Sequence, residues 1–130
     1  MKYYYSDGTA SSKYDGSKVL HREDGPAVEL ANGARGWYIN GKLHREDGPA
    51  VEDANGTRAW WRNGKNHRDD GPAVEYANGH RAWYINDHSI SILTKKQLIK
   101  YMEVNNLTIA HLLTDSDELV RTSAAKCDWK

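Results

Sequence analysis

Residues 21–43 read HREDGPAVELANGARGWYINGKL, and residues 44–66 and 67–89 repeat this pattern without a gap. The three copies begin at His21, His44 and His67, so the period is 23 residues. Self-similarity at a short fixed period is typical of repeat proteins, in which each unit packs against its neighbours. The sequence therefore predicts three equivalent units stacked within a single cooperative body.

The flanking segments differ from the three units. Residues 1–20 keep the spacing of the two turn glycines, because Gly8 and Gly16 lie as far apart as Gly56 and Gly64. This segment is a degenerate, tyrosine-rich half-unit, which we expect to cap the array and keep its end soluble. We divide the chain into this cap (1–20), the three β-hairpin repeats (21–89) and a helical tail (90–130).

The Asn32-Gly33 pair predicts a hairpin with a two-residue type I′ turn, because both turn positions need a positive φ. This register places Leu30 opposite Arg35 and Val28 opposite Trp37. Successive strand side chains alternate between the two faces of a sheet. The predicted faces are Val28, Leu30, Arg35, Trp37 and Ile39 on one side, and Ala27, Glu29, Gly36 and Tyr38 on the other. The tryptophans Trp37, Trp60 and Trp83 are then expected to pack against Val28, Val51 and Val74.

The tail has helical signals. Thr94 and Gln97 have the spacing of a capping box, and Asn105-Asn106 offers a natural helix end. A short segment around residues 109–113 follows, and Asp115 to Asp117 supply negative charge at the start of a last helix. We expect this tail to cover the open edge of the last hairpin, where unpaired backbone groups favour aggregation.

The units resemble the MORN repeat family and its variants, which have a β-hairpin unit with an aromatic residue before Asn-Gly-Lys, then a His and a Gly-containing turn. The matching residues are Trp37, Tyr38, Asn40, Gly41, Lys42, His44 and Gly48, and they recur as Trp60, Trp61, Asn63, Gly64, Lys65, His67 and Gly71. The form His-Arg-Glu/Asp-Asp-Gly-Pro-Ala is also similar to repeats in small proteins of bacteria and bacteriophages. The resemblance covers residues 1–89 and implies a scaffold. The sequence has Arg-Glu-Asp where that pattern often has Gly, which weakens the transfer of the lipid binding claimed for some members of the family.

The expected fold is mainly β: an antiparallel meander of stacked β-hairpin repeats, rolled or twisted, with a small C-terminal α-helical cap. The 18 basic and 18 acidic side chains give no net charge, so we expect neither nucleic acid nor a membrane as partner. Cys127 is the single cysteine and the opening MKYYYSDGTA lacks the basic and apolar regions of a secretory signal. We therefore expect a cytoplasmic protein, in the host-cell cytoplasm if it is phage-encoded.

Histidine and aspartate recur once per unit, as His21/Asp24, His44/Asp47 and His67/Asp70. We interpret these pairs as structural hydrogen bonds that fix the Gly-Pro turns, because a catalytic or metal site is normally singular. A metal or catalytic site along this His/Asp edge is the less favoured alternative, since a spacing of 23 residues differs from the short ligand pairs of zinc sites. We expect no catalytic residue, no metal and no cofactor.

Function is better sought where the copies differ. The differing positions include Leu30, Asp53 and Tyr76; Ile39, Arg62 and Ile85; Ala34, Thr57 and His80; and Tyr38, Trp61 and Tyr84. The predicted register places Asp53 and Arg62 on the face of Trp60, with Trp61 on the other. Aromatic residues and arginine are enriched at protein interfaces, although Asp53 and Arg62 can also form a solvated ion pair. The candidate partner-binding residues are Asp53, Trp61, Arg62, Tyr76 and His80.

The leading hypothesis is a non-catalytic protein-interaction module, and the phage-like repeats suggest an inhibitor of a host defence protein. The partner is a protein of unknown identity, and a homodimer through the sheet edge or the helical tail stays open. The first alternative is a sponge that sequesters a small anionic nucleotide between arginine and aromatic side chains. The second is an enzyme or metal site on the His/Asp edge.

Overall fold

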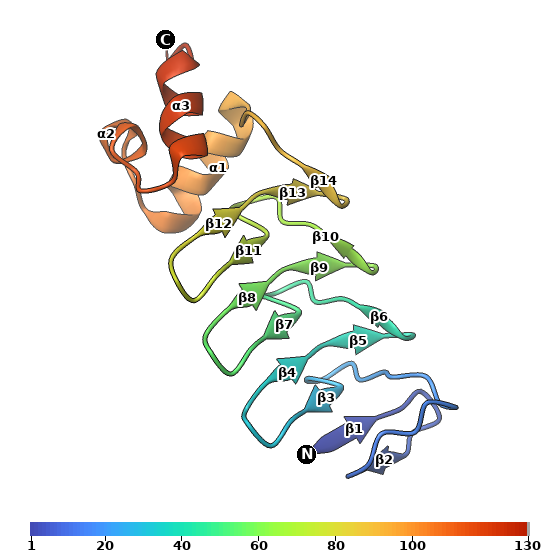
Figure 1. Cartoon of the computed structure of the whole chain (residues 1–130). Coiled ribbons are helices and arrows are strands. Elements are labelled where there is room, and N and C mark those ends of the chain that lie inside the picture. The colour runs from blue at the N-terminus through green and yellow to red at the C-terminus, as the bar shows by residue number, and fades with distance from the viewer. Residues whose placement is uncertain (130) are drawn as a thin grey trace.

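The structure is a computed structural model that describes residues 1–129. Figure 1 shows short antiparallel strands stacked as successive rungs, with the N-terminus at one end of the stack and three helices at the other. The prediction of a mainly antiparallel β meander that ends in a short helical C-terminal region is confirmed.

The strands are short, most of them two residues long. They are β1 (Lys2–Tyr4), β2 (Ala10–Ser11), β3 (Val28–Glu29), β4 (Arg35–Gly36), β5 (Tyr38–Ile39), β6 (Lys42–Leu43), β7 (Val51–Glu52), β8 (Arg58–Ala59), β9 (Trp61–Arg62), β10 (Lys65–Asn66), β11 (Val74–Glu75), β12 (Arg81–Ala82), β13 (Tyr84–Ile85) and β14 (His88–Ser89). Eight of them form one sheet in the order β12-β11-β8-β7-β4-β3-β1-β2, and the others form the pairs β5-β6, β9-β10 and β13-β14. Each 23-residue unit therefore contains two hairpins, one in the large sheet and one beside it.

The first hairpin of each unit has a three-residue turn, not the predicted two-residue turn. In the first unit the Leu30 N–H donates to the Ala34 carbonyl at 2.8 Å, and the Gly33 N–H donates to the Leu30 carbonyl at 3.0 Å. Gly33 has a positive φ of 93°, as a three-residue loop made of a type I turn and a left-handed glycine requires. The predicted turn is wrong because Asn-Gly suits this loop as well as it suits a type I′ turn.

This longer turn shifts the register of the hairpin by one residue. Val28 pairs with Gly36, and Glu29 pairs with Arg35. The equivalent pairs recur in the second unit (Val51 with Ala59, Glu52 with Arg58) and in the third (Val74 with Ala82, Glu75 with Arg81). A slip of one residue moves each side chain of one strand to the opposite face relative to its partner. The predicted faces are therefore wrong, and Trp37 does not share a face with Val28.

The observed pairing defines two faces, which we name here. The ladder face carries Ala27, Glu29, Arg35 and Trp37 with their equivalents Ala50, Glu52, Arg58 and Trp60, and Ala73, Glu75, Arg81 and Trp83. The open face carries Val28, Leu30, Ala34, Gly36 and Tyr38 with their equivalents Val51, Asp53, Thr57, Ala59 and Trp61, and Val74, Tyr76, His80, Ala82 and Tyr84. The alanines of the ladder face are completely buried.

The second hairpin of each unit has the type I′ turn. Asn40 and Gly41 both have positive φ, 50° and 79°, and they connect β5 to β6. In the third unit Asn86 and Asp87 take the same conformation with φ of 48° and 68°. The Gly41 N–H donates to the Leu20 carbonyl of the preceding segment at 2.8 Å. These turns therefore tie each unit to the one before it.

The N-terminal half-unit continues the sheet. β1 pairs with β3 of the first unit on one side and with β2 on the other. Tyr3 pairs with Val28, which brings Tyr3 to the open face, and its ring contacts that of Tyr14 at a centroid distance of 5.5 Å. Tyr5 is buried, forms a bridge with Leu20 and accepts the Asp15 N–H on its hydroxyl at 2.8 Å.

The helical region contains α1 (Lys95–Asn105), α2 (Ile109–Leu113) and α3 (Glu118–Lys126). The predicted signals are confirmed: Thr94 and Gln97 form the capping box of α1, Asn106 ends it in the left-handed conformation, and Asp117 is the N-cap of α3. The three helices and Trp83 enclose the main apolar core, which contains Leu93, Leu98, Tyr101, Leu112, Val120 and Ala124. The helices thus pack against the last repeat.

Candidate interaction face

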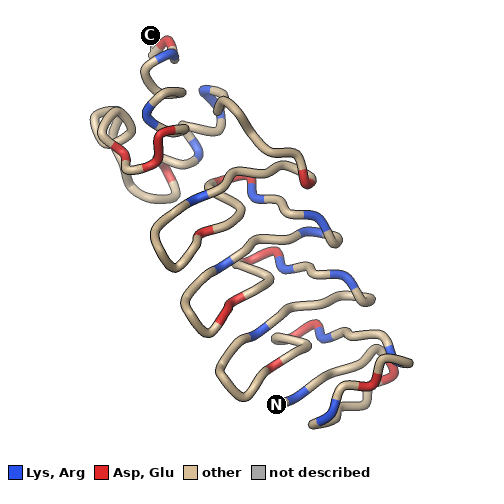
Figure 2. Tube along the Cα trace, viewed as in Figure 1, with Lys and Arg blue, Asp and Glu red and all other residues tan. Residues whose placement is uncertain are grey.

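On the ladder face an arginine of each unit stacks on an aromatic ring of the preceding one. The Arg45 guanidinium lies 3.9 Å from the centroid of the Trp37 ring, and Arg68 lies at the same distance from Trp60. Arg22 stacks in the same way on Tyr4 of the half-unit, at 4.0 Å. A contact of this kind contributes about 0.5–2 kcal/mol, depending on its desolvation. Figure 2 shows basic and acidic positions recurring at the same places in successive rungs.

The same arginines hold the Gly-Pro loops together. Arg45 donates from Nε to Asp47 at 2.9 Å and from a terminal nitrogen to the Pro49 carbonyl at 3.0 Å. A Cβ on Gly48 would lie 3.0 Å from the guanidinium carbon, so glycine lets the loop close around this side chain. Arg35 and Arg58 of the preceding strands form ion pairs with Glu52 and Glu75 of the following units. Adjacent units are therefore joined by both stacking and charge.

The recurring histidines have partners other than the predicted aspartates. His44 Nδ1 accepts the backbone N–H of Asn63 at 3.0 Å, and its Nε2 lies 3.4 Å from Glu46. His21 contacts Asn40 and Glu23 in this way, and His67 contacts Asn86 and Asp69. The aspartates Asp24, Asp47 and Asp70 instead accept from Arg22, Arg45 and Arg68. The predicted His–Asp hydrogen bond is wrong, because the arginine fork occupies the carboxylate beside each Gly-Pro turn.

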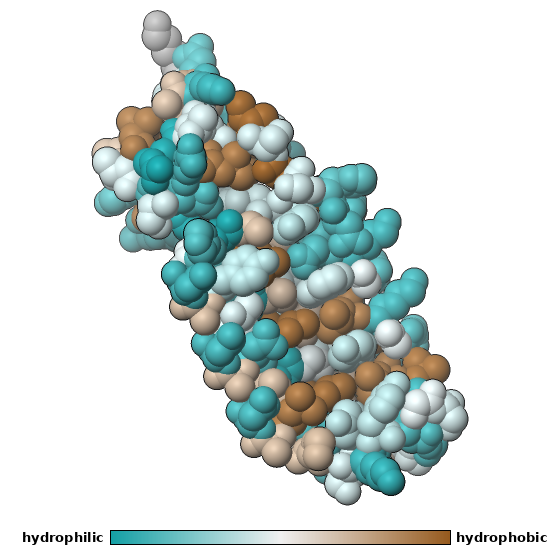
Figure 3. All heavy atoms as spheres, viewed as in Figure 1, coloured by the Kyte–Doolittle hydropathy of each residue, from teal (hydrophilic) through white to brown (hydrophobic). Residues whose placement is uncertain are grey.

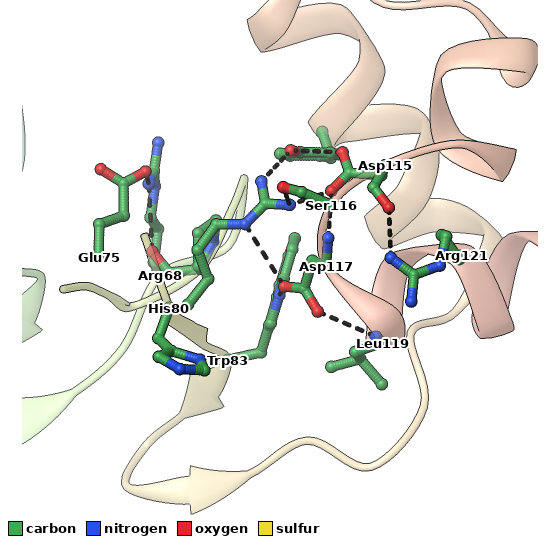
Figure 4. Close-up of polar contacts among 12 residues, drawn as sticks. Arg68, Glu75, His80, Trp83, Asp115, Ser116, Asp117, Leu119 and Arg121 are labelled. Atoms are coloured by element: carbon green, nitrogen blue, oxygen red, sulfur yellow. Dashed lines mark hydrogen bonds and ion pairs between the residues drawn. The ribbon is translucent and has the colours of Figure 1, made fainter. Parts of the chain in front are cut away.

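The helical region takes the place of a fourth unit at the end of the ladder face (Figure 4). The Trp83 indole N–H donates to Asp117 at 2.8 Å, and its ring meets that of Tyr101 edge-on at a centroid distance of 5.4 Å. Arg81 forms an ion pair with Asp115 and donates to the Tyr101 hydroxyl at 2.6 Å. Burial raises the pKa of Tyr101 above its usual range, so this hydroxyl stays protonated and donates to Asp115.

Four of the five predicted partner-binding residues lie on the open face. Asp53, Tyr76 and His80 flank the three-residue turns, and Trp61 lies in β9. Arg62 lies elsewhere: it contacts Asp69 at 3.3 Å and lines a hollow together with Trp60 of the ladder face. The predicted pairing of Asp53 with Arg62 is therefore wrong, and the cause is the one-residue shift in register.

Within the part of each unit that runs from the buried alanine to the end of the first hairpin (residues 27–38 and their equivalents), all four positions at which the copies differ lie on the open face. These are Leu30, Asp53 and Tyr76; Ala34, Thr57 and His80; Gly36, Ala59 and Ala82; and Tyr38, Trp61 and Tyr84. Five other positions differ and lie outside this hairpin: Glu23, Glu46 and Asp69; Ile39, Arg62 and Ile85; Gly41, Gly64 and Asp87; Lys42, Lys65 and His88; and Leu43, Asn66 and Ser89. The alanine, glutamate, arginine and tryptophan of the ladder face are the same in every unit, as is the valine of the open face. Within the first hairpin, the differences are therefore confined to the open face.

The open face is partly apolar and has no second layer over it in Figure 1. Leu30 and Tyr76 are 38% and 47% exposed, and Val28 and Val51 are half-buried. Figure 3 shows apolar side chains, drawn brown, gathered between polar ones across the strands. A hollow of about 150 Å³ opens at the first two units and is lined by Val28, Leu30, Ala34, Arg35, Gly36, Tyr38, Val51 and Asp53. Sequence reasoning missed this grouping because it placed Tyr38 and Leu30 on opposite faces.

Two larger hollows adjoin α1 and share Asp69 and Lys100. One, of about 560 Å³, is lined by Asp69, Ile85, Lys96, Gln97, Ile99, Lys100 and Glu103. The other, of about 500 Å³, lies against the loops that contain Arg45 and Arg68. Lys96 and Lys100 form no ion pair with any of residues 1–129. Their i, i+4 spacing on a helix was the signal that could have found them.

Within residues 1–129, no three or more His, Cys, Asp or Glu side chains are grouped so that they could hold a metal ion. None of the helices in that range is long and apolar enough to cross a membrane. Comparisons with protein-family models, with curated proteins and with solved structures found no match to this chain. The geometry of the two faces therefore carries the functional argument.

Proposed function

We propose that the chain is a non-catalytic protein-interaction module that binds a protein partner with its open face. The observation that carries this proposal concerns the first hairpin of each unit: its four variable positions all lie on the open face, while its ladder-face residues are invariant. The ladder-face side chains make the stacking and ion-pair contacts between units, and they are the same in every unit. Among the open-face variable side chains, Thr57 accepts the Ala77 N–H of the next unit, whereas Asp53 forms no ion pair within residues 1–129 and is available to a partner.

The composition of the open face supports a protein as the partner. Trp61, Tyr76 and Tyr38 are aromatic, and aromatic side chains are enriched in interface cores. Half-buried valines lie between them on a sheet whose stacking is fixed by contacts on the other face. Such a preformed surface loses little conformational entropy on binding. The repeats form a MORN-like scaffold in this proposal, and their likeness to bacterial and phage repeats points to a host defence protein as the class of partner, with inhibition as the outcome.

The test is affinity capture from the source-cell lysate with the full chain and two sets of substitutions. The first set, Asp53→Ala with Trp61→Ala and Tyr76→Ala, removes three side chains of the open face. The matched control, Arg62→Ala with Lys65→Ala, removes paired residues of β9 and β10 that lie on the other side. Circular dichroism and light scattering verify that both variants are folded and monodisperse.

We expect the parent chain and the control to retain one protein at a fixed molar ratio, and the open-face variant to lose it. Equal retention by all three chains would refute the assignment of the open face. Capture of no protein by the parent chain would remove the protein-interaction proposal itself.

A second candidate function is sequestration of a small anionic nucleotide. The hollows beside α1, at about 560 and 500 Å³, have the size of small-molecule sites, and Lys96 and Lys100 offer cations that no described residue neutralises. Binding would raise the melting temperature, because a ligand of the native state stabilises it by mass action. A thermal-shift panel of nucleotides, repeated with Lys96→Ala and Lys100→Ala, tests this function. The absence of any shift across the panel counts against it.

A further inference from the structure

The hollow beside Asp53 is the most specific feature of the open face. It is lined mainly by apolar residues of β3, β4 and β7 and of the turn segments beside them, together with Tyr38 of β5, Arg35 and Asp53. Its volume of about 150 Å³ is below the ~300–1,000 Å³ of typical small-molecule sites, so it suits a single side chain. We propose that this hollow receives a lysine or arginine side chain of the protein partner. The inference rests on the proposed function.

The charge of the hollow carries the argument for a cation. Asp53 is exposed, and its carboxylate forms no ion pair with any of residues 1–129. Arg35 also lines the hollow, but its guanidinium is paired with Glu52 and lies 5.5 Å from the Trp37 ring on the ladder face. Its side chain belongs to the ladder face, where its charge is paired. The uncompensated charge of the hollow is therefore negative.

The apolar lining selects a long cation over a small one. Lysine and arginine have alkyl stems that pack along apolar surface while the charged head stays at a polar rim. The stem would lie against Val28, Val51 and Leu30, and the head would reach Asp53. The Tyr38 ring can add a cation–π contact to the same head. A bare metal ion fits poorly, because the hollow offers one carboxylate among apolar groups and hard cations need several oxygen ligands.

Residues at the equivalent positions of the three units explain why this hollow lies at the junction of the first and second units. The position of Asp53 is Leu30 in the first unit and Tyr76 in the third, so Asp53 is the acidic copy. The glycine of the first unit, Gly36, leaves room beside Tyr38, because a Cβ there would lie 3.0 Å from the ring. Alanines replace this glycine in the other two units. The acidic residue Asp53 and the glycine that leaves room beside Tyr38 thus occur together at the junction of the first two units.

The test uses a displayed library of short random peptides selected against the full chain, because it needs no knowledge of the natural partner. We expect selected peptides to share a lysine or arginine next to apolar residues. Asp53→Asn keeps the size of the side chain and removes its charge, and should weaken these peptides roughly tenfold or more. Asp53→Lys should reverse the preference towards peptides with Glu or Asp. The control Glu46→Gln removes an exposed carboxylate of a Gly-Pro loop and should leave affinity unchanged.

The outcomes separate this inference from the proposed function. Peptides that lose affinity with Trp61→Ala, carry no basic residue and bind Asp53→Asn as tightly as the parent would overturn the cation site and leave the open face as the binding surface. Peptides selected without dependence on any open-face residue would overturn both. A change of the peptide lysine to methionine should lower the affinity for the parent chain but not for Asp53→Asn. This result would support the pair between Asp53 and the peptide lysine directly.

Discussion

Asp117 connects the last repeat to the helical region, and its removal should destabilise both. One carboxylate oxygen caps α3 by accepting the Leu119 N–H at 2.9 Å, and the other accepts the Trp83 indole N–H at 2.8 Å. Loss of an N-cap costs about 1 kcal/mol. A buried donor left without an acceptor costs about 1–3 kcal/mol, and Trp83 is only 5% exposed. We expect Asp117→Ala to lower the free energy of unfolding by about 2–4 kcal/mol.

Urea denaturation followed by far-ultraviolet circular dichroism measures this change, and a thermal melt should show a fall of roughly 10 °C for a chain of this length. Asp117→Ser is the matched control, because serine can still cap the helix but is too short to reach the indole. It should lose the contributions of Trp83 and of the ion pair with Arg81, but keep that of the helix cap. In a double-mutant cycle, Trp83→Phe should cost roughly 1–2 kcal/mol less in the Asp117→Ala background. A variant Asp117→Ala within about 0.5 kcal/mol of the parent would refute this reasoning.

Three further changes test other parts of the fold. Gly41→Ala places a side chain at a φ of 79° with its Cβ 3.3 Å from Val19, and should lower the free energy of unfolding in urea by about 1–2 kcal/mol, whereas Leu43→Ala should leave the turn intact. Arg45→Lys keeps the charge but loses the planar fork that reaches Asp47 and Pro49 and stacks on Trp37; we expect a loss of about 1–2 kcal/mol, and a melting temperature equal to the parent's would contradict the ladder role of this arginine. Hydrogen bonds from the Thr9 hydroxyl and N–H lower the pKa of Asp7 from 3.8 to about 2. Because the folded pKa is depressed, the stabilisation by Asp7 is fully present above about pH 4 and is lost as the pH falls through about 2; a carboxyl-carbon NMR titration with a midpoint near 3.8 would contradict this.

Local signals with a defined chemistry were predictable from the sequence. The period of the units follows from their near-identity, and the capping box at Thr94 and Gln97 follows from two side chains that satisfy each other's backbone donors. The end of α1 at Asn106 needs a residue that tolerates the left-handed conformation, which asparagine does. In each case the residues that decide the structure are close in sequence and have few competing partners.

Register and long-range partners were not predictable in this way. Asn32-Gly33 fits two hairpin turns that differ by one residue, and the choice between them reverses which side chains share a face. Asp47 lies near both His44 and Arg45 in sequence. It pairs with Arg45 because the planar guanidinium can donate to its carboxylate. The sequence therefore placed Arg62 on one face with Asp53, whereas Arg62 contacts Asp69 of the next unit. That the candidate residues bind a partner stays a prediction.

The two faces of the sheet explain how one short unit can serve both stability and recognition: the ladder face joins the units, and the open face is proposed to bind the partner. On the ladder face Trp60 takes its stacking arginine from the next unit, and Arg58 takes its carboxylate there, so a change at any of these positions affects two units at once. Within residues 1–129, the side chains of open-face residues such as Asp53 and Trp61 form no such stacking or ion-pair contact with the next unit. Substitutions there should alter binding with little effect on folding, since nearest-neighbour interfaces supply much of the stability of a repeat array. A loss of binding without a loss of stability is therefore the signature that this architecture predicts for its recognition surface.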